Sequence, residues 1–156
     1  DPAAGRERSL VYMGSYMPYK NVETLAAALP LLGADWVLHC MSRVCDADRR
    51  RLTALAPSGS IVFHDGASDD EYLATLRSAT ALVTASRDEG FGIPLVEAMG
   101  VGTPVAVSDT AHMGSLFRYS RPFHEQLQSG YKCSQGLLVH GSQHYAALAS
   151  LRCVVL

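Results

Sequence analysis

Residues 81–107 read ALVTASRDEGFGIPLVEAMGVGTPVAV, and this stretch decides the fold. Apolar runs at residues 81–85 and 105–107 predict two buried strands. Between them, the apolar spacing over residues 94–99 predicts a helix, which a proline can begin and a glycine can end. A crossover helix between two strands implies that the strands are parallel, because the helix must carry the chain back over the sheet.

The same alternation of strand and helix extends towards both ends of the chain. Further strands are predicted at residues 10–13, 36–41, 61–63 and 137–139, and further helices at residues 21–29, 46–56, 69–79 and 143–151. Ser68 and Glu71 have the spacing of a capping box at the start of one of these helices. The sequence therefore predicts an α/β fold: a Rossmann-like parallel sheet with helices on both faces.

The chain has 156 residues, 48% hydrophobic and 18% charged, which suits one soluble domain with a single core. We assign residues 1–9 to a linker and residues 10–156 to the domain. A formal net charge of −2 provides no basic field for a nucleic acid or an anionic membrane. No apolar run approaches the roughly 18 residues of a membrane span, so we expect no integral membrane segment.

The four cysteines show neither a C-x-x-C pair nor the spacing of a zinc site. We therefore expect reduced thiols, a reducing compartment and a cytoplasmic location. The last four residues, CVVL, have the form of a prenylation box, but no polybasic run precedes them, and the triplet also fits a strand or a cut chain end. We do not expect lipidation.

The loop before the helix at residues 94–99 has the residues of a ligand site. Gly90 and Gly92 allow close approach of a ligand to the backbone, and the helix N-terminus favours an anion. Glu89 and Glu97 can accept hydrogen bonds from sugar hydroxyls. The combination suits a phosphorylated sugar, but a tight turn with Glu89 in solvent and Glu97 on the helix surface fits equally well.

Two other predicted strands end in polar residues that belong to the same edge of the sheet. Lys20 follows the first strand and Gly14, and it could meet a diphosphate, although an ordinary exposed lysine explains it better in isolation. His64 and Asp65 follow the strand at residues 61–63, where a plain turn is the simpler role.

Residues 89–100, EGFGIPLVEAMG, followed by GTPVAVS at 102–108, resemble the E-x7-E signature of retaining GT-B glycosyltransferases of the fourth sequence family, the glycosyl transferases group 1. Gly14, Pro18, Lys20 and Asn21 resemble that family's first phosphate-binding element, and residues 66–73 its loop and helix after the third strand. The resemblance runs from about residue 10 to 109 and resumes at Glu125 and residues 136–139. A divergent loop at about 110–124 departs from it.

The resemblance implies a role for each matching residue. Lys20 and Glu89 would be the catalytic residues: Lys20 would stabilise the departing diphosphate, and Glu89 would bind sugar hydroxyls. Glu97 would bind the ribose. The remaining substrate-binding residues would be Gly14, Ser15, His64, Asp65, Gly90, Phe91, Gly92, Ile93, Leu95 and Val96. Many relatives carry an arginine where this chain has Ser15, so Lys20 would carry more of the diphosphate's charge.

The resemblance also implies an architecture and a reaction. The chain would be the donor-binding, C-terminal half of a GT-B enzyme that transfers a hexose, such as mannose or glucose, from a UDP-, GDP- or ADP-linked donor to a glycan or lipid acceptor with retention. By the same resemblance, the N-terminal acceptor domain would be missing from this chain, and we expect the chain alone to be inactive. We expect no cofactor and no metal, with Asp69 and Asp70 starting a helix, and in the whole enzyme peripheral attachment at the inner face of a membrane.

Three other functions deserve comparison. A nucleotide-sugar epimerase would use the same phosphate site but needs its own acid and base, and the E-x7-E spacing disfavours it. A non-catalytic nucleotide-binding or regulatory domain would explain the missing acceptor half and the divergent loop. A dinucleotide-dependent oxidoreductase is disfavoured because no G-x-G-x-x-G follows the first strand.

Overall fold

The computed structural model describes residues 6–108, 132–134, 137–139 and 153–155. The predicted helix at 143–151, the divergent loop at 110–124 and Glu125 lie outside these residues. The strands are β1 (Glu7–Tyr12), β2 (Val37–Cys40), β3 (Ile61–Phe63), β4 (Ala79–Thr84), β5 (Val105–Ser108), β6 (Lys132–Ser134), β7 (Leu137–Val139) and β8 (Cys153–Val155). The helices are η1 (Pro18–Lys20, a 3₁₀ turn), α1 (Val22–Leu32), α2 (Asp46–Thr53), α3 (Asp69–Ser78) and α4 (Ile93–Gly100).

The main sheet has the strand order β3-β2-β1-β4-β5-β8. Its first five strands are parallel, as the alternating pattern predicted, whereas β8 pairs antiparallel with β5. Residues 153–155 of the CVVL segment therefore form a strand, which is one of the alternatives considered for it. The predicted strand at 137–139 is present, but it pairs with β6 in a separate two-stranded antiparallel sheet and not in the main one.

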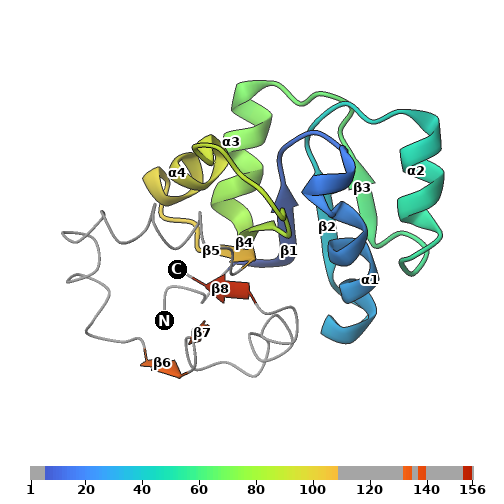
Figure 1. The fold of residues 1–156 in the computed structure, drawn as a ribbon. Helices are drawn as coiled ribbons and strands as arrows, with labels where there is room; N and C mark the ends of the chain where they lie inside the picture. Colours follow the sequence, from blue (N-terminus) through green and yellow to red (C-terminus); the bar gives the residue numbers. More distant parts are fainter. Residues whose placement is uncertain (1–5, 109–131, 135–136, 140–152, 156) are drawn as a thin grey trace.

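Helices cover both faces of the main sheet, as the α/β pattern predicted (Figure 1). Leu10 and Tyr12 of β1 pack in one core cluster with residues of α1 and α2. Val11, which points the opposite way, packs in a second cluster with residues of α3 and α4. Both clusters are fully buried around β1 and β4, because a central strand of a parallel sheet has an apolar layer on each side. The central strands therefore present their ends, and not their faces, to solvent, whereas the edge strand β3 exposes Val62.

The assignment of residues 1–9 to a linker was wrong for residues 7–9, which belong to β1. β1 begins at Glu7, and Ser9 is buried. The Arg6 guanidinium donates hydrogen bonds to the carbonyls of Ala79 and Gly102, at 2.9 and 2.8 Å. Because these residues are polar, the first residues of β1 lack the apolar pattern that predicts a strand. A central strand nevertheless extends as far as its neighbours supply backbone partners.

The predicted capping box at the start of α3 is only half present. The Ser68 hydroxyl accepts a hydrogen bond from the Glu71 N–H at 3.3 Å, as expected for an N-cap. The Glu71 carboxylate does not return to the N-cap residue and instead contacts His64 Nδ1 at 2.6 Å. Helix ends also shift: α1 continues past Pro30 to Leu32, and α2 stops at Thr53.

Candidate functional site

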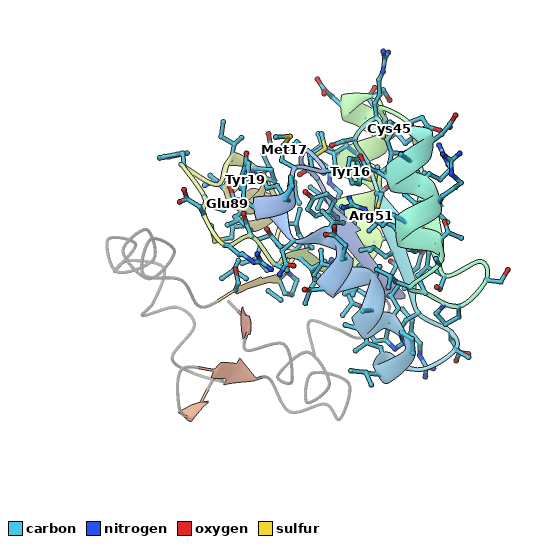
Figure 2. All side chains as sticks on the ribbon, turned by 45° about the vertical axis from the view of Figure 1, so that its right-hand side comes forward. Tyr16, Met17, Tyr19, Cys45, Arg51 and Glu89 are labelled. Carbon is cyan, nitrogen blue, oxygen red and sulfur yellow. The ribbon has the colours of Figure 1, made fainter. Side chains whose placement is uncertain are left out.

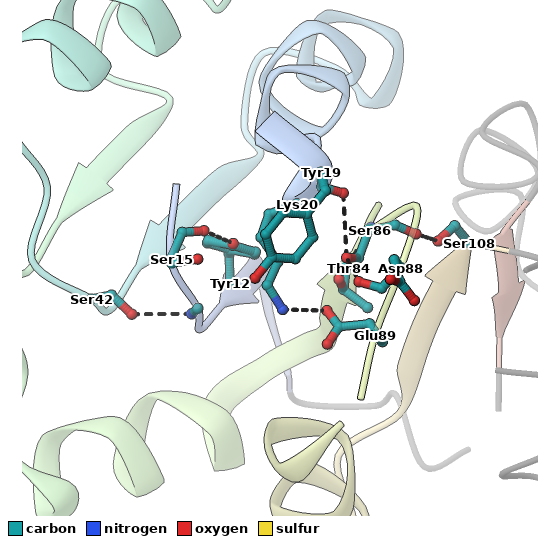
Figure 3. Close-up of polar contacts among 11 residues, drawn as sticks. Tyr12, Ser15, Tyr19, Lys20, Ser42, Thr84, Ser86, Asp88, Glu89 and Ser108 are labelled. Carbon is teal, nitrogen blue, oxygen red and sulfur yellow. Dashed lines mark hydrogen bonds and ion pairs between the residues drawn. The ribbon is translucent and has the colours of Figure 1, made fainter. Parts of the chain in front are cut away.

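The candidate site lies where the carboxyl ends of β1 and β4 meet. β2 lies on the far side of β1 and β5 on the far side of β4, so the chain connections diverge from this point. Open parallel sheets bind ligands in the crevice outside such a point. The turn that carries Lys20 follows β1, and the loop that carries Glu89 follows β4; Figure 3 shows the two facing each other.

Lys20 and Glu89 form an ion pair at this edge. Lys20 Nζ lies 2.8 Å from Glu89 Oε1, and the two side chains are only 16% and 13% exposed. The Tyr19 ring also lies beside the ammonium group, whose nitrogen is 5.3 Å from the ring centroid. Figure 2 shows Tyr19 and Glu89 next to each other at this edge. The fold thus joins the two residues predicted to be catalytic, although 69 positions separate them in sequence.

A cavity of about 200 Å³ lies beside this ion pair. It is lined by Met13, Gly14, Lys20, Leu82, Val83, Thr84, Glu89, Gly92, Pro94 and Leu95. Five of the residues predicted to bind substrate or to act in catalysis are among them: Gly14, Lys20, Glu89, Gly92 and Leu95. Ligand pockets for drug-sized molecules typically enclose about 300–1,000 Å³. The cavity is therefore the size of one part of a nucleotide sugar, and not of the whole molecule.

The two glycines that line the cavity lie where a side chain would meet close neighbours. A Cβ at residue 14 would lie 2.9 Å from the Tyr12 hydroxyl oxygen. Gly92, the N-cap of α4, has φ +69°, and a Cβ there would lie 3.0 Å from Leu95 Cδ1. Without either glycine, a neighbouring side chain would have to move into the cavity or the backbone would have to change.

Hydrogen bonds fix the loop after β1. The Gly14 N–H donates to Ser42 Oγ at 3.0 Å, and the Ser42 hydroxyl contacts Met13 Sδ at 3.3 Å. The Tyr12 hydroxyl donates to the Ser15 carbonyl. Burial raises the pKa of Tyr12, so this hydroxyl remains a donor at neutral pH. Ser15 itself is exposed and does not line the cavity.

The predicted site residues of the α4 region divide into buried and exposed positions. Leu95 is buried against the sheet. Phe91 and Ile93 are 67% and 60% exposed, and Gly90 and Val96 are also exposed. The side chains of Phe91 and Ile93 do not line the cavity, so any contact they make there would come from their backbone N–H groups.

Glu97 does not line the cavity with Glu89. It is exposed on α4 and faces Tyr72 of α3: burial, followed by the nearby Glu97 carboxylate, raises the pKa of the Tyr72 hydroxyl. The two glutamates of the E-x7-E segment therefore have different surroundings. One carboxylate neutralises a lysine inside the site, and the other is exposed to solvent beside the Tyr72 hydroxyl.

His64 and Asp65 lie at the end of β3, the edge strand, and do not line the cavity. His64 contacts Glu71, as described, and its Nε2 lies 2.9 Å from His39 Nδ1. Asp65 has φ +55° and pairs with Arg49 through both carboxylate oxygens at 2.7 Å. The structure thus shows a bend after β3 that is held by the contacts of His64 with Glu71 and His39 and by the ion pair of Asp65 with Arg49.

Three polar residues of the site were missed in the sequence. Thr84 lines the cavity, Ser42 binds the Gly14 N–H, and Ser86 joins the two loops. Each lies at or just after the end of a predicted parallel strand. That position was the available signal, because the carboxyl ends of parallel strands share one edge of the sheet.

Among the described residues, no three His, Cys, Asp or Glu side chains are grouped so as to hold a metal ion. Asp69 and Asp70 lie in the first turn of α3, where carboxylates stabilise the helix dipole. No helix in the described part of the chain has the length and apolar character needed to cross a membrane.

A Rossmann-like sheet with a lysine and a glycine-rich helix N-terminus at its switch point is typical of nucleotide-binding enzymes. The family model described as glycosyl transferases group 1 matches residues 7–150, and the chain belongs to this family. Its Rossmann-like sheet and flanking helices match part of the structures of GT-B glycosyltransferases.

Two curated mannosyltransferases and one solved structure illustrate the likeness. MMP alpha-(1->4)-mannosyltransferase of Mycolicibacterium hassiacum is 35% identical over 99 residues, 53% of this chain and 24% of that protein. The O-antigen chain mannosyltransferase RfbU of Salmonella typhimurium is 29% identical over 128 residues, 80% and 33% respectively. The catalytic domain of cholesterol-alpha-glucosyltransferase from Helicobacter pylori has a TM-score of 0.55 and 25% identity over 65% of this chain and 64% of that one. The chain thus spans about a quarter to a third of these curated relatives.

Proposed function

We propose that this chain binds the nucleotide diphosphate sugar donor of a retaining hexosyltransferase, with the diphosphate at the cavity between β1 and β4. The observation that carries the proposal is the placement of Lys20. Lys20 lines a cavity that is also lined by the N-terminal residues of α4, so a cationic side chain and a helix N-terminus border the same space.

The chemistry of the proposed reaction matches this arrangement. As the bond to the sugar loosens, negative charge grows on the departing nucleotide diphosphate. Lys20 would stabilise that charge, and the N-terminus of α4 would add its dipole. We expect no divalent cation to be needed at this site.

Glu89 would have two successive partners. In the structure its carboxylate is paired with Lys20. When the diphosphate takes over the ammonium group, the carboxylate becomes available to accept hydrogen bonds from sugar hydroxyls. Binding of the donor would therefore exchange one ion pair for another, which limits the desolvation cost of bringing a diphosphate into the cavity.

The remaining predicted residues would act outside the cavity. A 200 Å³ cavity encloses part of a nucleotide sugar, so the ribose and base would extend along the surface. The exposed Glu97 carboxylate would bind ribose hydroxyls there, and His64 and Asp65 would contact the base if it reaches the end of β3. A further domain of the whole protein would supply the acceptor-binding site, since the chain spans only a fraction of the length of its relatives. A mannose donor is the first candidate because two of the curated relatives are mannosyltransferases.

The test is calorimetric titration of the chain with UDP, GDP and ADP, in the presence and absence of EDTA. We expect one nucleotide to bind, EDTA to have no effect, and Lys20→Ala to weaken binding by about 10- to 100-fold, the value of a charge-assisted hydrogen bond. Glu97→Ala should also weaken it. The control is Arg8→Ala, which removes one cation from an exposed ion pair with Asp35. Folded protein that gives no heat with any nucleotide would refute the proposal.

A further inference from the structure

Ser86 is a fully buried polar residue just after β4, with 0% of its surface exposed. Its hydroxyl lies 2.7 Å from the carbonyl oxygen of Asp88 and 3.4 Å from that of Tyr19 (Figure 3). A hydroxyl has one proton, so the shorter contact is the principal hydrogen bond and the longer one is the weaker branch of a bifurcated bond. The side chain therefore bridges two segments that are remote in sequence.

The two carbonyls have a specific relation to the site. Asp88 directly precedes Glu89, and Tyr19 directly precedes Lys20. A single buried hydroxyl thus contacts the peptide unit in front of each member of the ion pair. Fixing those peptide units restricts where the Cα atoms of Lys20 and Glu89 can lie, and with them the possible positions of the ammonium group and the carboxylate.

Further hydrogen bonds tie the same two segments together. The Arg87 N–H donates to the Tyr19 carbonyl at 2.8 Å. The Asn21 side-chain amide donates to the Ala85 carbonyl at 3.3 Å. These bonds join the turn that carries Lys20 to the loop that carries Glu89, on both sides of Ser86.

The backbone of Ser86 is itself anchored to the sheet. Its N–H donates to Thr84 Oγ1 at 3.4 Å, and its carbonyl accepts a hydrogen bond from the Ser108 hydroxyl. Thr84 ends β4 and Ser108 ends β5. Ser86 is thus held by the two strands at one end and holds the two loops at the other.

We propose that Ser86 is a positioning residue: its hydroxyl sets the geometry in which Lys20 and Glu89 meet and in which Lys20 receives a diphosphate. The effect on ligand binding rests on the proposed function. Without the hydroxyl, the Asp88 carbonyl loses its donor, and the Lys20 and Glu89 segments gain freedom that ligand binding must then remove. Loss of one such hydrogen bond corresponds to about a tenfold weaker affinity.

The experiment compares Ser86→Ala with Ser60→Ala in calorimetric titrations with UDP, GDP and ADP. Ser60 is a matched control because it is also buried, and its hydroxyl also donates to a nearby carbonyl, Pro57, at 2.7 Å. We expect Ser86→Ala to weaken binding about tenfold and Ser60→Ala to leave it within about twofold. Thermal unfolding of each variant shows whether loss of stability alone separates them.

A double-mutant cycle with Lys20→Ala tests whether Ser86 acts through Lys20. In that background Ser86→Ala should weaken the remaining affinity by less than about twofold, because the group it positions is gone. Ser86→Thr, which keeps the hydroxyl, should restore most of the affinity. If Ser86→Ala does not fold, Asn21→Gly removes the neighbouring tie, keeps the left-handed backbone of residue 21 (φ 52°), and should weaken binding in the same direction.

Each outcome decides the inference. Unchanged affinity in folded Ser86→Ala, equal losses in Ser86→Ala and Ser60→Ala, or full additivity with Lys20→Ala would overturn it while leaving the proposed function intact. If Asn21→Gly is needed, unchanged affinity in that variant overturns it as well. Wild-type chain that binds none of the three nucleotides would overturn the proposed function, and this inference with it.

Discussion

The ion pair between Lys20 and Glu89 gives the most direct stability prediction. Two unit charges 2.8 Å apart attract by about 6 kcal/mol at an effective dielectric of about 20. Desolvation of two side chains that are 16% and 13% exposed cancels most of this attraction. We therefore expect a coupling free energy of about 1–3 kcal/mol between the two residues.

The variants are Lys20→Met, Glu89→Gln and the double variant. Lys20→Met should lower the free energy of unfolding by about 2–3 kcal/mol, because it leaves the Glu89 carboxylate almost buried without its cation. Glu89→Gln should cost less, since the amide oxygen can still accept a hydrogen bond from the ammonium group. The double variant should be more stable than the sum of the two single changes predicts.

The assay is urea denaturation of the four proteins at neutral pH, followed by circular dichroism. The control cycle uses Arg8 and Asp35, which form an ion pair at a similar distance, 2.7 Å, with side chains 55% and 70% exposed. Its coupling should be below about 0.5 kcal/mol, as is usual for exposed pairs. If the Lys20 and Glu89 cycle gives no more coupling than this control, burial does not strengthen the pair and our reasoning fails.

Three further predictions concern the site and the sheet. Gly92→Ala should destabilise the chain by about 1–2 kcal/mol, because residue 92 has φ +69° and the new Cβ would lie too close to Leu95. The control Gly100→Ala adds a Cβ with no neighbouring atom, so it should be close to neutral in the same urea titration. Burial lowers the pKa of His39 below 6.5, so the unfolded chain binds protons more readily than the folded chain as the pH falls from 7 to 5, and folding stability falls over this range. The melting temperature of His39→Gln should fall less over the same range. An equal fall in both proteins would contradict the assignment. Glu89→Gln should preserve or improve binding of the free nucleoside diphosphate while reducing the preference for the sugar-linked form, and calorimetry that finds the sugar-linked preference intact would exclude a sugar contact for Glu89.

The parts of the fold that could be predicted are those that local patterns specify. Local preferences made one segment predictable: the strand at 81–85, the glycine-containing loop and the helix that begins near Pro94. In this segment the conformational preference of each residue agrees with those of its neighbours. The start of β1 could not be predicted in this way. Glu7 and Ser9 have no apolar alternation, and they join the sheet through backbone partners that the neighbouring strands offer: Ala79 of β4 for Glu7 and Val37 of β2 for Ser9.

The candidate site was predictable in position and only partly in membership. The rule that parallel strands end at one edge placed Lys20 and Glu89 at the same edge, and the structure has them there; that they form an ion pair was not predicted. The same rule cannot say how far apart two strand ends lie along that edge. It therefore grouped His64 and Asp65, at the end of the edge strand β3, with residues that line the cavity between the central strands.

Sequence alone determined the alternating strands and helices, the parallel sheet and the residue types at its carboxyl edge, because apolar spacing, proline and glycine act through the nearest few residues. Tertiary structure decided which polar groups become partners. Glu71 has the spacing to close its own helix cap, yet it binds His64, and Ser86 meets the carbonyls in front of two charges 69 residues apart. Such choices depend on which groups the fold brings within hydrogen-bonding distance, and a buried hydroxyl such as that of Ser86 must take the partner that lies there.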